Sequence, residues 1–180
     1  MKKIALAIFL GVASTVVLRA DIFQIDFSGG GMNGGQEVPA NGSPATAFEF
    51  DGGLTYDNST MTLNVELAYG VFGGAVPLVG NYTIGQIYQG PAGVVGTPVI
   101  PLTNVPNDPH SGLIQNSVVL TPAQEVALFT DNLYVNIQSS LFPSGEIRAQ
   151  LVPTSVPEPA TWAMLGAGLA GLLILRRRAS

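Results

Sequence analysis

The stretch MTLNVELAY, residues 61–69, alternates apolar and polar side chains with a period of two. In an extended chain this period puts every second side chain on the same face, so it indicates a β-strand with one buried face. The preceding Asp57–Ser59 consists of turn-forming residues, and an apolar segment comes before it. We therefore expect residues 61–69 to be one arm of a β-hairpin that turns at Asp57–Ser59.

Further short runs of apolar or alternating side chains predict more strands along the middle of the chain. These strand candidates are Ile22–Phe27, Ala45–Phe50, Tyr82–Tyr88, Val94–Ile100, Ser117–Leu120, Leu133–Gln138 and Glu146–Val152. The segments 29–35 and 101–112 are rich in glycine or proline and are typical of loops. Many short strands joined by Gly/Pro-rich turns predict an all-β fold, an antiparallel Ig-like Greek-key β-sandwich.

One short helix is expected among the strands, within TPAQEVALF at residues 121–129. Thr121 stands at the N-cap, Pro122 at the first helical position and Gln124 three residues after the cap, which is the pattern of a capping box. Asp131 and Asn132 are expected to end the helix. The apolar residues expected to face the core are Val126, Leu128 and Phe129.

The N-terminus has the three parts of a secretory signal peptide. Lys2 and Lys3 form a basic start, Ile4–Leu18 is apolar, and Ala20 is a small residue at which cleavage is expected. Residues 1–20 would then be removed. The alternative is an uncleaved anchor, for which this apolar run is short, since a membrane-spanning helix needs roughly 20 residues.

The C-terminus carries a second apolar run, Ala160–Leu175, which contains no charged residue and predicts a transmembrane helix. Basic residues stay on the cytoplasmic side of a membrane, so residues 21–154 would lie outside the cytoplasm. The residues that would stop transfer through the membrane are Arg176, Arg177 and Arg178.

The triplet Pro157, Glu158, Pro159, followed by a short apolar helix and an arginine cluster, resembles the PEP-CTERM sorting domain of Gram-negative bacteria. The resemblance covers residues 155–180. It implies recognition by an exosortase-type membrane protease, which cuts near the motif. The inner membrane would hold the chain transiently, and the released part would reach the cell envelope or the extracellular matrix, where such proteins accompany exopolysaccharide. The alternative is a permanent single-pass anchor.

Removing both signals leaves residues 21–154, which are enough for one domain with a substantial core. Arg148 is the only basic side chain in that domain, which carries eleven carboxylates. Such a domain repels nucleic acid and anionic lipid, although it would tolerate cations. The absence of cysteine excludes disulfides, thiolate zinc sites and cysteine nucleophiles. We therefore predict no nucleic-acid partner, no cofactor and no metal site.

Four motifs in this domain resemble, in order, those of the CHRD (chordin-type) domain. They are NGGQEVPA at 33–40, IYQGPAG at 87–93, LTPAQEVALF at 120–129 and LYVNIQSSLFPSGEIRAQL at 133–151. The resemblance implies a compact β-sandwich, of a kind found in extracellular proteins whose activity is poorly defined.

The chain departs from the resemblance where many members of the family carry histidines. Those positions hold Gly85, Gln86, Tyr88 and Gln138. Amide and phenol groups are poor ligands for transition metals. Gln86, Tyr88 and Gln138 could instead form a polar patch that binds sugar hydroxyls of an extracellular polysaccharide. The alternative is the ordinary polarity of a strand surface.

Arg148 is expected to pair with a carboxylate, for which Glu146 and Glu37 are the candidates. The alternative role for Arg148 is a ligand contact. Asp108, His110 and Ser111 are close in sequence, but a triad needs groups from separate elements in a defined geometry, and turn formation is favoured here.

No catalytic residue is predicted. The sequence favours a non-enzymatic structural or binding protein of the cell envelope or extracellular matrix. The alternative is a cation- or carbohydrate-binding module associated with exopolysaccharide.

Overall fold

The computed structural model describes residues 22–70, 74–155, 166 and 168. The predicted signal peptide with its cleavage at Ala20, the sorting motif Pro157–Pro159 and the membrane stop Arg176–Arg178 lie outside the described residues. Within the described part of the chain, no helix is long and apolar enough to cross a lipid bilayer.

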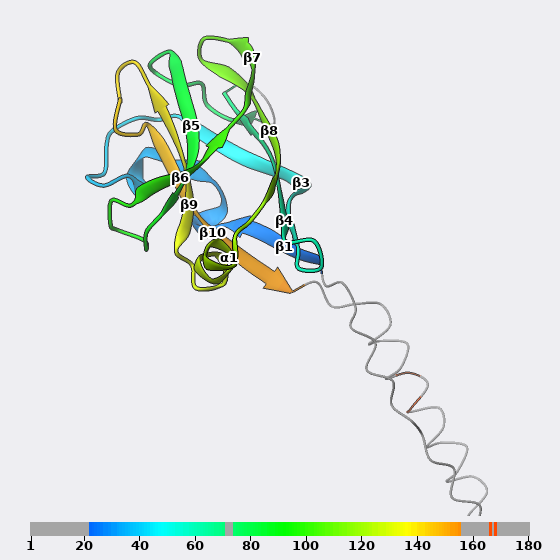
Figure 1. Cartoon of the computed structure of the whole chain (residues 1–180). Coiled ribbons are helices and arrows are strands. Elements are labelled where there is room, and N and C mark those ends of the chain that lie inside the picture. Colours follow the sequence, from blue (N-terminus) through cyan, green and yellow to red (C-terminus); the bar gives the residue numbers. More distant parts are fainter. Residues whose placement is uncertain (1–21, 71–73, 156–165, 167, 169–180) are drawn as a thin grey trace, which may run out of the picture.

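All the strands are hydrogen-bonded into one antiparallel sheet (Figure 1). The strands are β1 (Ile22–Phe27), β2 (Met32–Asn33), β3 (Thr46–Asp57), β4 (Thr62–Tyr69), β5 (Tyr82–Gln89), β6 (Thr97–Leu102), β7 (Asn104–Asp108), β8 (Ser111–Val119), β9 (Leu133–Ser139) and β10 (Ile147–Ser155). Their order across the sheet is β6-β5-β9-β10-β1-β3-β4-β8-β7, and β2 pairs with both β10 and β3. Short 3₁₀ turns, η1 (Ser28–Gly30) and η2 (Gly34–Gln36), flank β2.

The sheet folds over on itself, so that its two halves pack as the layers of a sandwich. Gly85 in β5 lies directly across the core from Ile114 in β8, because a Cβ at Gly85 would be 2.9 Å from the Cδ1 atom of Ile114. Neighbouring strands such as β4 and β8, or β5 and β9, are far apart in sequence, as a Greek-key arrangement requires. The predicted antiparallel β-sandwich with one short helix is confirmed.

The hairpin predicted around Asp57–Ser59 is confirmed, and its arms are β3 and β4. Oδ1 of Asp57 accepts hydrogen bonds from the backbone N–H of Ser59 at 2.8 Å and from its hydroxyl at 2.6 Å. These local bonds hold the turn, which explains why its position could be read from the sequence. β3 continues to Asp57 rather than ending at Phe50, with an irregularity in pairing between Glu49 and Leu54.

The helix α1 (Pro122–Phe129) begins as predicted, with both hydrogen bonds of the capping box between Thr121 and Gln124. The predicted inward face is partly wrong. Leu128 is buried together with Ala127, whereas Val126 is 62% exposed. Phe129 is partly exposed and packs edge-on against Phe23 of β1, with ring centroids 4.9 Å apart.

The segment 101–112, which was expected to be a loop, forms most of a hairpin between β7 and β8. Its prolines favoured the prediction of a loop, but proline is also tolerated on edge strands. β7 and β6 are the two edges of the sheet, and their prolines are Pro98, Pro101 and Pro106. β6 begins at Thr97 rather than at Val94, and β8 begins at Ser111, earlier than predicted.

The core lies between the two layers and is built from alternate side chains of the strands. In the closing hairpin, Ile137 is paired with Ile147 and Val135 with Ala149, and all four are fully buried. The side chains at the intervening positions therefore point to the outer surface of β9 and β10.

Candidate functional site

Polar side chains gather on the outer surface of β5, β9 and β10. Tyr88 is paired with Tyr134, and Tyr134 with Gln150, so these three residues form a row across the strands. Gln86, Asn136 and Arg148 form the next row. We refer to this surface as the polar face, and its residues are Gln86, Tyr88, Tyr134, Asn136, Gln138, Arg148 and Gln150.

The patch predicted from the sequence lies on the β5 side of the polar face, where its three residues are in contact. The Tyr88 hydroxyl donates to Oε1 of Gln86 at 3.2 Å and accepts from Nε2 of Gln138 at 2.6 Å. The Tyr88 ring stacks on Tyr134, with centroids 5.2 Å apart. Burial raises the pKa of Tyr88, so its hydroxyl stays neutral at physiological pH. The hydroxyl is thus bonded within the patch.

Arg148 does not form the predicted hydrogen-bonded pair with a carboxylate. Its guanidinium lies 3.4 Å from the centroid of the Tyr134 ring and donates to the carbonyls of Val94 at 2.9 Å and Pro91 at 3.0 Å. Arg148 is only 3% exposed. Gln150 extends the same pattern by donating to the carbonyl of Gly90 at 2.8 Å. The polar face therefore holds the loop 90–96 across the sheet.

Glu146, one of the two predicted partners of Arg148, is fully buried and bonded elsewhere. Its Oε1 accepts from the Ser43 hydroxyl at 2.7 Å and from the Val79 backbone N–H at 2.6 Å, and its Oε2 accepts from Gly80 N–H at 3.3 Å. This carboxylate therefore fixes the segment that leads into β5.

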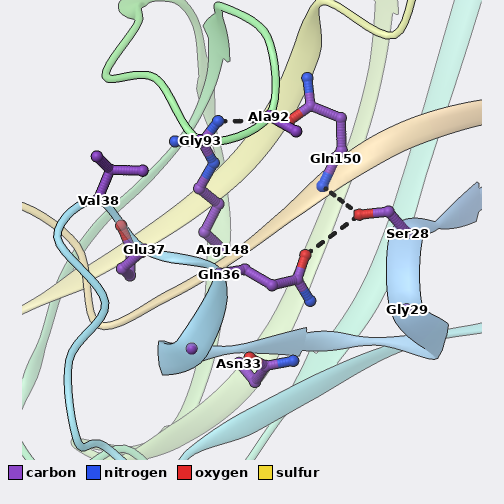
Figure 2. A pocket seen from close by; sticks show the side chains of 11 residues that line it. Ser28, Gly29, Asn33, Gln36, Glu37, Val38, Ala92, Gly93, Arg148 and Gln150 are labelled. Atoms are coloured by element: carbon purple, nitrogen blue, oxygen red, sulfur yellow. Dashed lines mark hydrogen bonds between the residues drawn. The ribbon is translucent and has the colours of Figure 1, made fainter.

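A pocket of about 470 Å³ opens beside Arg148 (Figure 2). One wall is the segment 28–38, the opposite wall is the tip of the loop 90–96, and Arg148 and Gln150 come from β10. Gln36 is held in the wall because Oε1 accepts from the Ser28 hydroxyl at 3.2 Å and Nε2 donates to Gly31 O at 2.7 Å. The lining residues are Ser28, Gly29, Asn33, Gly35, Gln36, Glu37, Val38, Ala92, Gly93, Arg148 and Gln150.

Glu37 lines this pocket and is only 8% exposed. Its Oε2 accepts a hydrogen bond from Nδ2 of Asn136 at 3.2 Å, whereas its Oε1 is buried without a hydrogen-bond partner among the described residues. Burial raises the pKa of Glu37 to about 7, although the charge of Arg148 and the hydrogen bonds from Asn136 and the Val38 backbone oppose this shift. We name the cavity the Glu37 pocket.

From the sequence, the only role predicted for Glu37 is that of a possible partner for Arg148. Arg148 acts on it through its charge rather than through a hydrogen bond. The neighbouring segment 29–35 is rich in glycine and predicts a loop, but no local pattern reveals that a glutamate beside it is buried. Its burial comes from Asn136 and Gly145, which lie about a hundred residues further along the chain.

Comparison with known families identifies this fold. The model of the CHRD domain matches residues 31–151, which contain the polar face and all the residues that line the Glu37 pocket except Ser28 and Gly29. The chain belongs to the CHRD domain family. A second model, the PEP-CTERM protein-sorting motif, matches residues 155–178. No curated protein and no solved structure matches the chain.

Asp108, His110 and Ser111 of this CHRD domain do not form a relay of the Ser-His-Asp type. The Ser111 hydroxyl donates to Oδ2 of Asp108 at 2.6 Å, so serine and aspartate are bonded directly. Nδ1 of His110 lies 2.9 Å from the carbonyl oxygen of Leu78 and 3.1 Å from that of Gly80, and it carries the proton that they accept. The histidine thus links the β7–β8 turn to the segment before β5.

The two ends of the sandwich lie side by side. β1 and β10 are paired antiparallel from Phe27 with Leu151 to Phe23 with Ser155. The first described residues and the start of the sorting motif therefore lie at the same end of the sandwich, and Figure 1 shows β1 and β10 together at this end.

Proposed function

We propose that the protein is exported, trimmed at both ends, and acts outside the cytoplasm as a non-enzymatic structural or binding component of the cell envelope or matrix. The sorting motif implies processing by exosortase, a membrane protease, and export through a membrane-anchored intermediate. The mature protein would then be the CHRD domain, about residues 21–154.

The pairing of Phe23 with Ser155 is the observation that carries this proposal. If apolar segments before and after a folded domain both enter the same membrane, the two ends of the domain must lie close together on the side that faces the membrane. The register of β1 and β10 meets this condition at the ends of the domain. It also leaves the sandwich intact when both extensions are removed.

The fixed state of three of the chemically versatile side chains, Arg148, Glu146 and His110, supports a non-enzymatic role. Arg148 is bonded to two loop carbonyls, Glu146 to two backbone N–H groups, and His110 to the carbonyls of Leu78 and Gly80. These groups stabilise loops, and each would have to leave its partners to take part in a reaction.

The mass of the protein recovered from its host tests this proposal. We expect the intact 18.7 kDa chain to be shortened at both ends, near Ala20 and near Pro157–Pro159. Glu158→Ala should retain the C-terminal segment and remain in the membrane, whereas Glu66→Ala, on the surface of the sandwich, should be processed normally. A full-length chain in the cytosol would overturn the proposal.

Saccharide binding is a second candidate, favoured by the Glu37 pocket. The cavity is within the size range of small-molecule sites and is lined by three side-chain amides, those of Asn33, Gln36 and Gln150. Cation binding in this pocket is less favourable, because the fixed charge of Arg148 is close enough to lower the pKa of Glu37.

A further inference from the structure

Two buried acceptor atoms have no hydrogen-bond partner among the described residues, although they belong to side chains that are bonded to each other. They are Oε1 of Glu37 and Oδ1 of Asn136. The other polar atoms of the same two groups are joined, because Nδ2 of Asn136 donates to Oε2 of Glu37 at 3.2 Å. An unpaired buried acceptor is costly in the folded state, so a donor shared by these two atoms would stabilise it.

The donor cannot come from the neighbouring side chains. Nδ2 of Asn136 faces two acceptors, Oε2 of Glu37 at 3.2 Å and the Ser144 carbonyl at 3.5 Å, and turning the amide over would set an oxygen against both. The guanidinium of Arg148 is directed at loop carbonyls and at Gln150. Both unpaired atoms are also shielded from solvent. The missing donor is therefore one that the two groups carry themselves.

A carboxyl group carries such a donor when it is protonated. A neutral carboxyl has one O–H, which donates, and one C=O oxygen, which accepts. Opposite a side-chain amide, these two atoms complement the amide oxygen and nitrogen, and the groups form a ring closed by two hydrogen bonds. One of these bonds is present between Asn136 and Oε2 of Glu37. The two unpaired atoms are the ones that the second bond would join.

We propose that Glu37 is protonated in the folded domain and that its Oε1–H donates to Oδ1 of Asn136, which closes a carboxyl–carboxamide pair. We call it the Glu37–Asn136 pair. It satisfies both buried acceptors without a ligand. It goes beyond the export and binding roles proposed above and depends on neither.

The groups around Glu37 decide the pH range over which this proton is kept. Burial raises the pKa of Glu37 to about 7, although the charge of Arg148 from β10 and the hydrogen bonds to the carboxyl oppose the shift. Tyr88 from β5 is the other titratable group that interacts with Glu37. Burial, the neighbouring Tyr134 and the charge of Glu37 raise the pKa of the Tyr88 phenol, so Tyr88 stays neutral in this range. The pair is closed at pH 5. As the pH rises through about 7 the proton passes to solvent, and a buried carboxylate is left facing the Asn136 oxygen.

The pair ties together two parts of the chain that are distant in sequence. Glu37 follows η2, Asn136 lies in β9, and Gly145 packs against both. Losing the proton should loosen the turn around Glu37, where the N–H groups of Glu37 and Asn41 donate to the Gly34 carbonyl at 3.3 Å and 3.0 Å. The pair is thus a latch that is closed at acidic pH and weakened above neutrality.

Infrared difference spectroscopy of the full chain in a zwitterionic detergent tests the pair. The C=O stretch of a protonated carboxyl lies apart from the amide bands, and its frequency falls when the O–H donates a hydrogen bond. Subtracting the spectrum of Glu37→Gln from that of the wild type isolates the Glu37 band. We expect a band of a protonated, hydrogen-bonded carboxyl at pH 5 that disappears with a midpoint of about 7. A Glu37 that is ionised at pH 5 would overturn the proposal.

Asn136→Leu separates the pair from the effect of burial alone. It keeps the size of the side chain but removes the acceptor, so in the folded variant at pH 5 the Glu37 band should move to the higher frequency of an unbonded O–H. Asn64→Leu, at an exposed asparagine of β4, is the matched control and should leave the band in place. A band that Asn136→Leu does not move would show that the proton does not lie between these two groups.

Hydrogen exchange tests the latch without any change at Asn136. After correction for intrinsic rates, the backbone amides of residues 37 and 41 should exchange about tenfold faster at pH 8 than at pH 5 in the wild type. Glu37→Gln should abolish this difference, because its amide can make both hydrogen bonds of the pair at either pH. Equal corrected rates in the wild type would refute the latch. None of these outcomes alters the masses expected from trimming at both ends.

Discussion

The outer surfaces of the two layers carry similar polar side chains but differ in what covers them. On β3, β4 and β8, the exposed polar residues bond to one another, as when Nε2 of Gln115 donates to Oε1 of Glu66 at 2.9 Å. We call this surface the open face, and its residues are Thr55, Asn64, Glu66, Gln115 and Ser117. On the polar face, by contrast, Arg148 and Gln150 bond to the backbone of the loop 90–96 and are buried by it.

The difference shows that alternation alone does not distinguish a solvated surface from a second, polar core. Both faces follow the period of two that sets the buried side. The polar face lies against the loop 90–96, whose carbonyls need donors, and Arg148 and Gln150 supply them. Substitutions on the two faces should therefore differ strongly in their effect on stability.

The largest effect is expected for Arg148→Ala. The change removes three hydrogen bonds from a charged donor, to the carbonyls of Pro91 and Val94 and to Oε1 of Gln150, and it uncovers the Tyr134 ring. We expect the free energy of unfolding to fall by about 4 kcal/mol. Urea denaturation measures it. Arg148→Lys keeps the charge but has a single nitrogen in place of the two that donate to the carbonyls, so it should recover only part of the loss. An unchanged urea midpoint for Arg148→Ala would contradict the role of these contacts in holding the loop 90–96.

Gly145→Ala should cost about 3 kcal/mol, because φ at Gly145 is 143° and an added Cβ would be pressed against Asn136 and both carboxyl oxygens of Glu37. Gly52→Ala on the β3 side is the matched control. Its φ is 74°, but a Cβ there meets no atom within 4 Å, so about 1 kcal/mol of backbone strain is expected. Equal thermal shifts for the two variants would show that the Glu37 environment is not tightly packed.

Glu37→Gln should change how stability depends on pH. Because burial raises the pKa of Glu37 from 4.5 to about 7, the folded chain holds this proton more tightly than the unfolded chain. Its contribution to stability is complete below pH 4.5 and is lost as the pH rises through 7. We therefore expect the variant to gain stability relative to the wild type between pH 5 and pH 8, as chemical denaturation at each pH would show. A constant difference across this range would refute the assignment.

The smallest effect is expected on the open face. Glu66→Ala removes an exposed hydrogen bond to Gln115 and should change the free energy of unfolding by less than about 0.5 kcal/mol. Differential scanning calorimetry is sensitive enough to detect a larger change. A cost comparable to that of Arg148→Ala would remove the distinction between the two faces.

The parts of this fold that local chemistry determines could be predicted from the sequence. The cap at Thr121, the turn at Asp57 and the alternating strand after it each depend on residues only a few positions apart. The inward face of α1 was harder to predict from the sequence, because this helix of eight residues lies at the edge of the core and its Val126 points to solvent.

The site was harder to predict because its contacts join residues that are far apart in the sequence. The partners of Arg148 are backbone carbonyls more than fifty residues away, and carbonyls carry no sequence signature. The sequence indicated that Gln86, Tyr88 and Gln138 would come together, and the structure brings them into contact. It gave no sign that the pocket would form on the other side of Tyr134, around Glu37.

The prolines of β6 and β7 have a consequence for contacts between copies of this domain. Each edge of the sheet is a row of backbone groups to which a strand of another copy could add. Pro98 and Pro101 on one edge and Pro106 on the other lack the N–H that such an addition would use. Crowded copies of this domain therefore resist polymerising into fibrils through their edges, and contacts between them must be made by side chains.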